Sequence, residues 1–95
     1  MESTADGVVH VTGDLVFANA VAMLARGEAL LNGRRELAFD LGGVDHADSA
    51  GLVLLLELLG RGRASGVMVS FHNIPSSLLR IARLSNAEVL LSFER

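Results

Sequence analysis

The chain has 95 residues, a formal net charge of −3 and no cysteine, and 51% of its residues are hydrophobic although only 4% are aromatic. This length predicts a single domain around an aliphatic core, and the lack of cysteine excludes disulfides and thiolate metal sites. All 8 basic residues are arginines scattered along the chain. That pattern argues against nucleic acid as the main ligand, because phosphate binding needs clustered positive charge.

The start of the chain and its longest apolar runs bear on its location. Residues 1–7 are acidic and polar, and they lack the basic segment that opens a secretory signal peptide. No apolar run approaches the roughly 20 residues that a membrane span requires. We therefore expect residues 1–6 to form a flexible tail and the domain to be cytoplasmic, without direct insertion into a membrane.

The first third of the chain predicts two short strands and a helix. Weak alternation over Gly7–Thr12 indicates a strand, Gly13–Asp14 is a turn signal, and Leu15–Phe17 is typical of a short partner strand. Asn19 is a suitable N-cap for a helix that ends near Asn32. That helix would turn one face of small and apolar residues toward the core, namely Ala20, Met23, Leu24, Gly27, Leu30 and Leu31.

The rest of the chain alternates strands with helices. The expected elements are a strand over 36–41, a helix from Ser49 or Ala50 to Ala64, a strand over 67–71, a helix from Pro75 to Leu84 and a short strand over 89–91. The resulting order, β-β-α-β-α-β-α-β, predicts a single α/β domain with a mixed β-sheet covered by helices.

The helix expected from residue 49 to 64 is unusually apolar. On a helical wheel its core stripe consists of Leu52, Leu55, Leu56 and Leu59. The opposite face carries Ala50, Glu57 and Arg61, flanked by Val53 and Leu54. Such a helix is either buried nearly all round in its own domain or shares its apolar surplus with a partner, and the sequence leaves both open. A surface meant for a partner can also pair with itself, so we expect the isolated domain to be capable of homodimerisation.

Ser49 is the most informative single residue, because its hydroxyl stands where a helix is expected to begin. A serine there can cap backbone N–H groups, accept a phosphate or contact a partner. The neighbouring Asp45, His46 and Asp48 invite a catalytic interpretation, but residues of one short loop seldom form an ordered relay. We therefore expect Ser49 or Asp48 to cap the helix and His46 to be solvated, with no catalytic residue among them.

The three histidines do not predict a metal site. His10, His46 and His72 are far apart in the sequence and lack the close spacing of metal ligands. We expect His10 and His72 to lie on strand surfaces. The chain also lacks a dedicated nucleotide motif, so no cofactor is expected.

Asp40 is a carboxylate inside an otherwise apolar strand. A buried carboxylate is costly unless it is paired or hydrogen-bonded. At the end of its strand, Asp40 could accept hydrogen bonds from N–H groups of residues 42–51. We therefore predict that Asp40 positions this loop and, through it, Ser49.

The stretch from Leu37 to Leu56 resembles the STAS domain, a fold shared by bacterial anti-sigma-factor antagonists and sulfate-transporter tails. The signature is a strand ending in Asp-Leu, a short loop, and Asp-Ser/Thr-x-Gly at the start of an apolar helix. Asp40–Leu41 and Asp48–Gly51 match it here. Further segments extend the likeness over most of the chain: Gly13–Leu15, Gly66–Phe71, Ile74–Pro75 and Leu79–Leu84.

The resemblance to anti-sigma-factor antagonists implies a phosphorylation switch. Ser49 would be the acceptor for a serine kinase that also sequesters sigma factor. A phosphate would add roughly −1.5 to −2 charges at a helix N-terminus that tolerates anions, and so reshape the docking surface. In this class an acidic residue follows the Gly-Glu-Leu turn, whereas Val16–Phe17 follow it here.

Other segments look more like the MlaB type of STAS protein, the small cytoplasmic subunit of the bacterial Mla phospholipid ABC transporter. They are Leu15–Val21, the leucine-dense helix and Leu79–Leu84. The resemblance implies that the chain binds the ATPase subunit of such a transporter at the inner membrane and supports its assembly or activity. The partner-binding residues would be Asp48, Ser49, Ala50, Gly51, Val53, Leu54, Glu57 and Arg61. We favour this interpretation and keep the anti-sigma-factor antagonist as the alternative.

Overall fold

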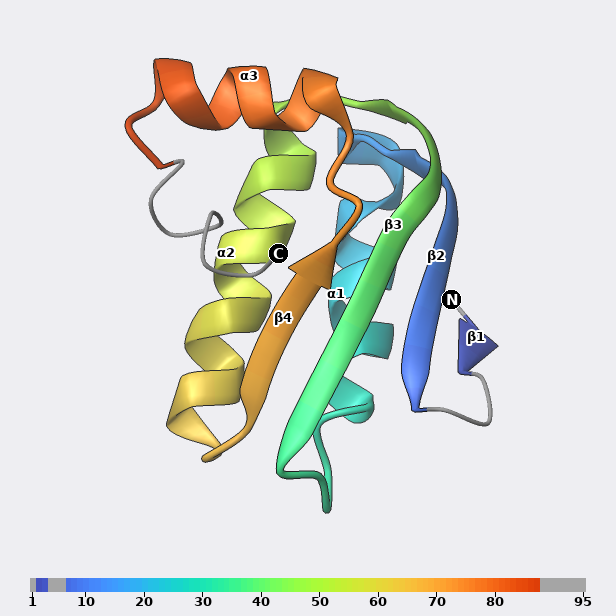
Figure 1. Cartoon of the computed structure of the whole chain (residues 1–95), viewed down its shortest axis with the longest axis vertical. Helices are drawn as coiled ribbons and strands as arrows, with labels where there is room; N and C mark the ends of the chain where they lie inside the picture. Colours follow the sequence, from blue (N-terminus) through green and yellow to red (C-terminus); the bar gives the residue numbers. More distant parts are fainter. Residues whose placement is uncertain (1, 4–6, 88–95) are drawn as a thin grey trace.

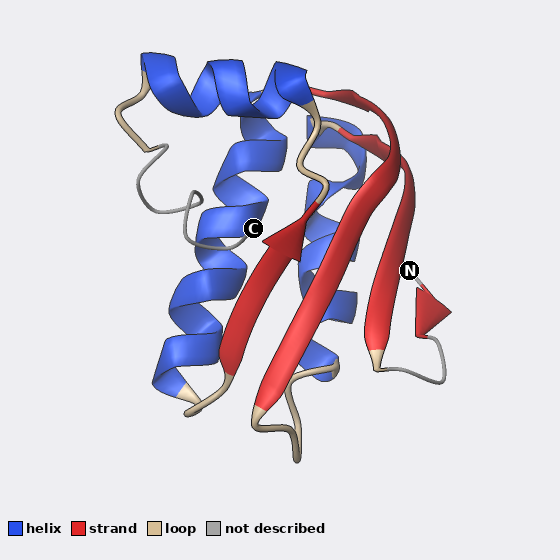
Figure 2. Ribbon diagram, in the orientation of Figure 1, coloured by secondary structure: helices blue, strands red, loops and turns tan. Residues whose placement is uncertain are grey.

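The computed structural model describes residues 2–3 and 7–87, which form a four-stranded sheet and three helices (Figures 1 and 2). The elements in chain order are β1 Glu2–Ser3, β2 Val8–Leu15, α1 Phe17–Ala29, β3 Glu36–Ala47, α2 Ser49–Ala64, β4 Met68–His72 and α3 Ser76–Leu84. The strands lie in the order β1-β2-β3-β4. β1 is antiparallel to β2, and the other neighbours are parallel. The mixed α/β fold predicted from the sequence is therefore confirmed.

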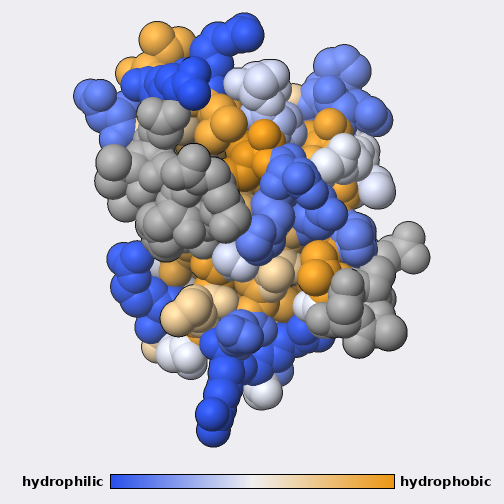
Figure 3. Space-filling model, in the orientation of Figure 1, coloured by the Kyte–Doolittle hydropathy of each residue, from blue (hydrophilic) through white to orange (hydrophobic). Residues whose placement is uncertain are grey.

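The helices are distributed unevenly around the sheet. α1 and α2 lie side by side on one face, and α3 crosses the end of the sheet where α1 and α2 begin (Figure 1). The opposite face carries no helix among the residues that the structure describes (Figure 2). Hydrophobic and hydrophilic residues are interleaved over that open face (Figure 3). No described helix has the combined length and apolarity that a membrane-spanning helix would need.

Alternation along the strands creates the core. Val9 and Val11 on β2 and Leu37 and Phe39 on β3 are buried, while the residues between them are more exposed. Phe39 is paired in register with Phe71 of β4, and their ring centroids are 5.7 Å apart. The core under α1 and α2 is therefore aliphatic around a single aromatic pair.

α2 packs on the sheet through a face that differs from the predicted leucine stripe. Gly51 and Gly62 lie eleven residues apart on one side of the helix, and both are buried. A Cβ atom on Gly51 would lie 2.5 Å from the carbonyl oxygen of Leu15, and one on Gly62 would lie 2.4 Å from Val69 Cγ2. These close approaches turn α2 by roughly a quarter turn relative to the prediction. The leucines are reassigned accordingly: Leu52, Leu54, Leu55 and Leu58 are buried, whereas Leu56 and Leu59 are half-buried.

The predicted turn at Gly13–Asp14 and the strand over Leu15–Phe17 are wrong. β2 continues through Gly13 to Leu15, and two register shifts in its pairing with β3 accommodate the change. Gly13 adopts a φ of +85°, the left-handed conformation that glycine tolerates. Pairing with a long neighbouring strand has overridden the local turn signal, so the two predicted strands are one.

Several element boundaries also differ from the prediction. α1 begins at Phe17 with Val16 as its N-cap, so Asn19 is not the cap, and the helix ends at Ala29. The Asn19 amide instead donates to the carbonyl oxygen of Asp14, 3.0 Å away. β3 extends to Ala47, six residues beyond the predicted end. Pro75 is the N-cap of α3 rather than its first helical residue.

The structure tests the prediction made for the start of the chain but not the one made for its end. Residues 1–6 were expected to form a tail, but Glu2 pairs with His10 and Ser3 with Val9 as an antiparallel edge strand. This edge strand was not predicted, and the first of the two predicted leading strands, over Gly7–Thr12, falls in β2. The strand predicted over 89–91 lies outside the described residues.

Candidate interaction site

Asp48 joins the start of α2 to the start of α1. Its Oδ1 accepts hydrogen bonds from the backbone N–H of Ala50, at 2.8 Å, and of Gly51, at 3.4 Å. Its Oδ2 accepts a hydrogen bond from the backbone N–H of Phe17, the first residue of α1, at 3.2 Å. One carboxylate therefore satisfies exposed donors of two helices, and the cap is Asp48 rather than Ser49.

The side chain of Ser49 is exposed and does not cap its helix. Ser49 is the first residue of α2. Its hydroxyl makes no hydrogen bond within the part of the chain that the structure describes, because Asp48 already provides the cap. The hydroxyl is therefore accessible at a helix N-terminus, where the helix dipole favours negative charge.

A shallow apolar groove begins beside Ser49 and runs between the two helices. We call it the α1–α2 groove, and it has a volume of ≈ 320 Å³. Its lining consists of Phe17, Ala20, Val21 and Leu24 from α1 and Ala50, Val53, Leu54 and Glu57 from α2. Phe17 and Val21 are each 78% exposed and Val53 is 58% exposed. These three are among the five large hydrophobic residues that are exposed in the described part of the chain.

An ion-pair cluster links the two helices further along the same surface. The Arg61 guanidinium donates from Nη1 to Glu28 Oε2 on α1 and from Nε to Glu57 Oε2, at 3.3 Å, on its own helix. The hydrogen bond to Glu28 is the largest cause that raises the pKa of Arg61 above its usual value. Two carboxylates thus share one guanidinium at this end of the surface.

The structure brings most of the predicted partner-binding residues to one surface. Ser49, Val53 and Glu57 are exposed on it, and Asp48, Ala50 and Arg61 are partly exposed. Two predictions require correction because Gly51 and Leu54 are buried. Gly51 is packed against Leu15, and Leu54, at 3% exposed, forms the floor of the groove rather than its surface.

Sequence analysis missed the contribution of α1 to this surface. Phe17 had been assigned to a strand, and Val21 received no role. The signal was nevertheless present, because Phe17, Val21 and Leu24 follow the spacing of one helix face once the helix begins at residue 17.

Asp40 accepts one of the predicted backbone hydrogen bonds, but it does not reach the start of α2. Its Oδ1 accepts hydrogen bonds from the backbone N–H of Gly42, at 2.8 Å, and from the side-chain amide of Asn73, at 3.0 Å. The bond to Gly42 lies within the predicted 42–51 range, but the second bond ties β3 to the loop between β4 and α3. The start of α2 is fixed by Asp48 instead, so the expected link from Asp40 to Ser49 is not formed.

Asp40 also stands between two histidines on the open face of the sheet. His10 on β2 and His72 on β4 are its partners in register. The His10 Nδ1 atom lies 3.5 Å from Asp40 Oδ2. The pKa of Asp40 is lowered mainly by the hydrogen bond from Gly42 and then by that from Asn73. Burial opposes this effect, and His10 and His72 add smaller contributions. His10 and His72 therefore lie on a partly exposed strand surface, as predicted.

The remaining polar residues do not assemble a relay around Ser49. His46 Nδ1 lies 3.3 Å from Asp14 Oδ1, and the His46 side chain is 80% exposed. The described residues contain no cluster of three or more histidine, aspartate or glutamate side chains that could hold a metal ion. His46 is therefore close to Asp14 rather than to Ser49, and the Ser49 hydroxyl is exposed.

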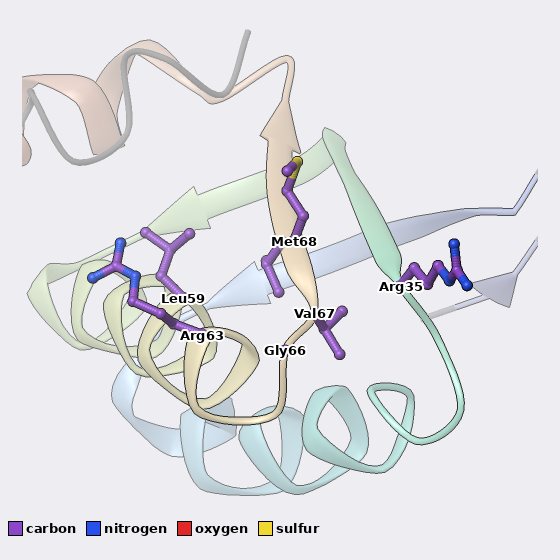
Figure 4. A pocket seen from close by; sticks show the side chains of 7 residues that line it. Arg35, Leu59, Arg63, Gly66, Val67 and Met68 are labelled. Carbon is purple, nitrogen blue, oxygen red and sulfur yellow. The ribbon is translucent and has the colours of Figure 1, made fainter.

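A second hollow lies at the far end of α2, beside the start of β4. It has a volume of ≈ 350 Å³, and its lining includes Leu59, Val67 and two arginines, Arg35 and Arg63. Figure 4 shows that Arg35 and Arg63 extend to opposite sides of β4. Their guanidinium groups do not converge, so this hollow lacks the paired donors of an anion site.

Comparisons with known proteins identify the fold family. A family model described as "Mlab, STAS domain" matches residues 2–92. A comparison with curated proteins finds no match. A crystal structure of a protein named Mglu is 32% identical over 73% of this chain, with a TM-score of 0.61. The native form of Mglu is 27% identical over 75% of this chain, with a TM-score of 0.57.

The chain spans only 17% and 22% of those two Mglu chains. A sulfate transporter family protein from Wolinella succinogenes matches 100% of this chain and 79% of its own, with a TM-score of 0.67. Its identity of 16% shows a likeness of fold alone. Because the family model spans nearly the whole sequence, the chain belongs to the STAS domain family, and within it to the MlaB type.

Proposed function

We propose that this chain is a non-catalytic, cytoplasmic subunit that binds the ATPase of an Mla-type phospholipid-trafficking ABC transporter and supports its assembly or activity. The proposal rests on one observation. Exposed apolar side chains cluster beside Ser49, whose hydroxyl makes no hydrogen bond with the described residues. An apolar patch rimmed by polar residues is typical of a protein interaction site. The ATPase would hold the chain at the inner membrane.

Membership of the MlaB type supports this choice of partner. The exposed strip of α2 from Ser49 through Val53 to Glu57 would form the centre of the interface. Asp48 would serve it indirectly, because it holds the starts of α1 and α2 together. Arg61 is engaged with two carboxylates, so it would mark the edge of the interface rather than supply a free charge.

The test is a binding titration between the purified chain and the purified ATPase of the Mla-type transporter from the same cell. Ser49→Arg places a long charged side chain at the centre of the proposed interface. We expect it to weaken binding by at least about tenfold. Ser77→Arg makes the same change on an exposed position of α3 and should bind like the wild type. Wild-type affinity for Ser49→Arg, or no binding by the wild type, would overturn the proposal.

A second function is favoured by the same free hydroxyl. In an anti-sigma-factor antagonist, a serine kinase would transfer the γ-phosphoryl group of ATP to Ser49 Oγ, with loss of the hydroxyl proton and release of ADP. Ser49 is chemically available for this step because it does not cap its helix. Mass spectrometry of the chain purified from its native cell tests the idea. Phosphate on Ser49, absent from Ser49→Ala, would support this function, and recovery with an unmodified Ser49 under all growth conditions would contradict it.

A further inference from the structure

We propose that the α1–α2 groove receives an amphipathic helix of the ATPase subunit, about three turns long, whose apolar side chains are flanked by lysine or arginine. The inference rests on the proposed function and extends it, because it adds α1 to the interface and specifies the chemistry of the partner element. The residues that would make the apolar contacts are Phe17, Val21 and Leu24 on α1 and Val53 on α2.

The groove is flanked by two rows of side chains, one on each helix, that are long enough to pack against a third helix. On α1, Phe17, Val21, Leu24 and Glu28 follow one another at steps of four, three and four residues. On α2, Ala50, Val53, Glu57 and Arg61 do the same at steps of three, four and four. Each row covers twelve residues and spans about 16 Å along its helix. Two parallel ridges of that length can accept about three turns of a third helix, packed ridge into groove.

The charges around the groove select a basic partner. At its open end the partly exposed carboxylate of Asp48 lies at the start of both helices. At the other end Glu28 and Glu57 share the single guanidinium of Arg61. Each end therefore keeps an excess of negative charge. A helix with lysine or arginine on the flanks of its apolar face would complement both ends.

Apart from Arg61 on α2, the basic residue to consider is Arg26 on α1, and it does not cancel the negative charge at the groove. Arg26 lies nine residues after Phe17, which places it on the opposite side of the helix from the groove. Within the described part of the chain, Arg61 is the basic residue whose hydrogen bonds join α1 to α2. Both of its partners, Glu28 and Glu57, are acidic. The preference for a basic partner therefore comes from the whole rim.

The exposure of the lining side chains favours a protein over a small apolar molecule. A ligand pocket encloses most of its ligand's surface, and its walls are correspondingly buried. Here Phe17 and Val21 remain 78% exposed and stand above a floor formed by Leu54. Projecting apolar side chains over a buried floor match the anchors of a helix-in-groove interface.

The test compares two neighbouring positions of α1 in binding to the purified ATPase. Val21→Arg places a cation in the groove, whereas Ala22→Arg places it on an exposed position about 100° further around the helix. We expect Val21→Arg to weaken binding by at least about tenfold and Ala22→Arg to bind like the wild type. Equal affinities for the two variants, both shown by thermal melting to be folded, would overturn the inference.

A crosslinking arm identifies the occupant. A photoreactive p-benzoylphenylalanine at Phe17, irradiated in the presence of excess ATPase, should join a segment of the ATPase that mass spectrometry can map. A mapped helix with apolar residues flanked by lysine or arginine would support the inference. A crosslink to an acidic segment, to a co-purified lipid or to a second copy of this chain would overturn it.

Comparing Ser49→Arg with Val21→Arg separates this inference from the function on which it rests. If Ser49→Arg abolishes binding while Val21→Arg does not, the ATPase docks on α2 alone and only the groove inference fails. If the wild-type chain does not bind the ATPase at all, the proposed function itself fails.

Discussion

Individual carboxylates in this domain act through the backbone groups they hold. Asp40 and Asp48 are both partly buried, and each accepts hydrogen bonds from two separate segments. Asp48 supports the proposed docking site because it fixes the starts of α1 and α2. Asp40 lies on the open face of the sheet, in register with His10 and His72. The same side chain chemistry thus supports the site in one case and the sheet in the other.

The lowered pKa of Asp40 predicts a pH-dependent contribution to stability. Because the folded state favours the ionised carboxylate, this contribution is fully present above the pKa of the unfolded chain. It is lost as the pH falls through the lower pKa of the folded state. We expect Asp40→Asn to unfold more easily than the wild type near pH 7, and the difference to shrink below about pH 4. Urea unfolding at a series of pH values measures this difference.

Asp45→Asn provides the matched control for Asp40→Asn. Asp45 is exposed and makes no side-chain hydrogen bond with any residue that the structure describes. The substitution Asp45→Asn removes the same charge as Asp40→Asn, but it does not alter a hydrogen-bond acceptor that the fold uses. A stability difference for Asp40→Asn that stays constant from about pH 7 to about pH 3 would contradict the assigned role of the carboxylate.

At the scale of elements, the predictable parts are those decided by local pattern. α2 was predicted with its observed bounds, because the capping segment and a terminal glycine mark its ends. The face of α2 that packs on the sheet was not predictable in this way. It depends on how closely Gly51 and Gly62 approach β2 and β4, and that is a property of the assembled fold. The continuation of β2 through Gly13 likewise depends on its pairing with β3.

The candidate site was only half visible in the sequence for the same reason. The residues of α2 could be located because the Asp48–Gly51 motif marks the helix start. Phe17 and Val21 joined the site only when the boundary between β2 and α1 was known. The helix cap lies three residues before the predicted one, at Val16 rather than Asn19, so Phe17 becomes helical and shares a face with Val21 and Leu24. The groove between two helices is therefore harder to predict than either helix.

The joint between α1 and α2 yields a prediction at this scale. Asp48→Ala removes the cap of α2 and the acceptor for the Phe17 N–H, so we expect the free energy of unfolding to fall by about 1–2 kcal/mol. Asp48→Asn keeps an oxygen that can cap α2, but it loses an acceptor for α1. It should therefore lie between Asp48→Ala and the wild type. Urea unfolding of the three proteins ranks them, and equal stability of Asp48→Ala and the wild type would contradict the joint.

At the scale of the whole molecule, both helices that form the groove lie on the same face of the sheet, with their N-termini together (Figure 1). Asp48 lies where those N-termini meet, Glu28 and Glu57 lie further along the two helices, and the whole chain carries a net charge of −3. The long-range field and the local rim therefore have the same sign. The proposed basic helix would be attracted before contact as well as held after it. Homodimerisation of the isolated domain stays a prediction, and the acidic rims of two copies would oppose it if they met face to face.

This common sign leads to a kinetic prediction. Screening shortens the reach of charge attraction as salt is added. We expect the association rate with the ATPase to fall by about tenfold between about 50 mM and about 500 mM salt, measured by stopped-flow fluorescence. Glu57→Gln removes one rim carboxylate and should make that dependence shallower. Glu36→Gln removes an exposed carboxylate at the start of β3, far from the groove, so it should behave like the wild type. A rate independent of salt would mean that apolar contact alone guides docking, and the charged rim would then lose its assigned role.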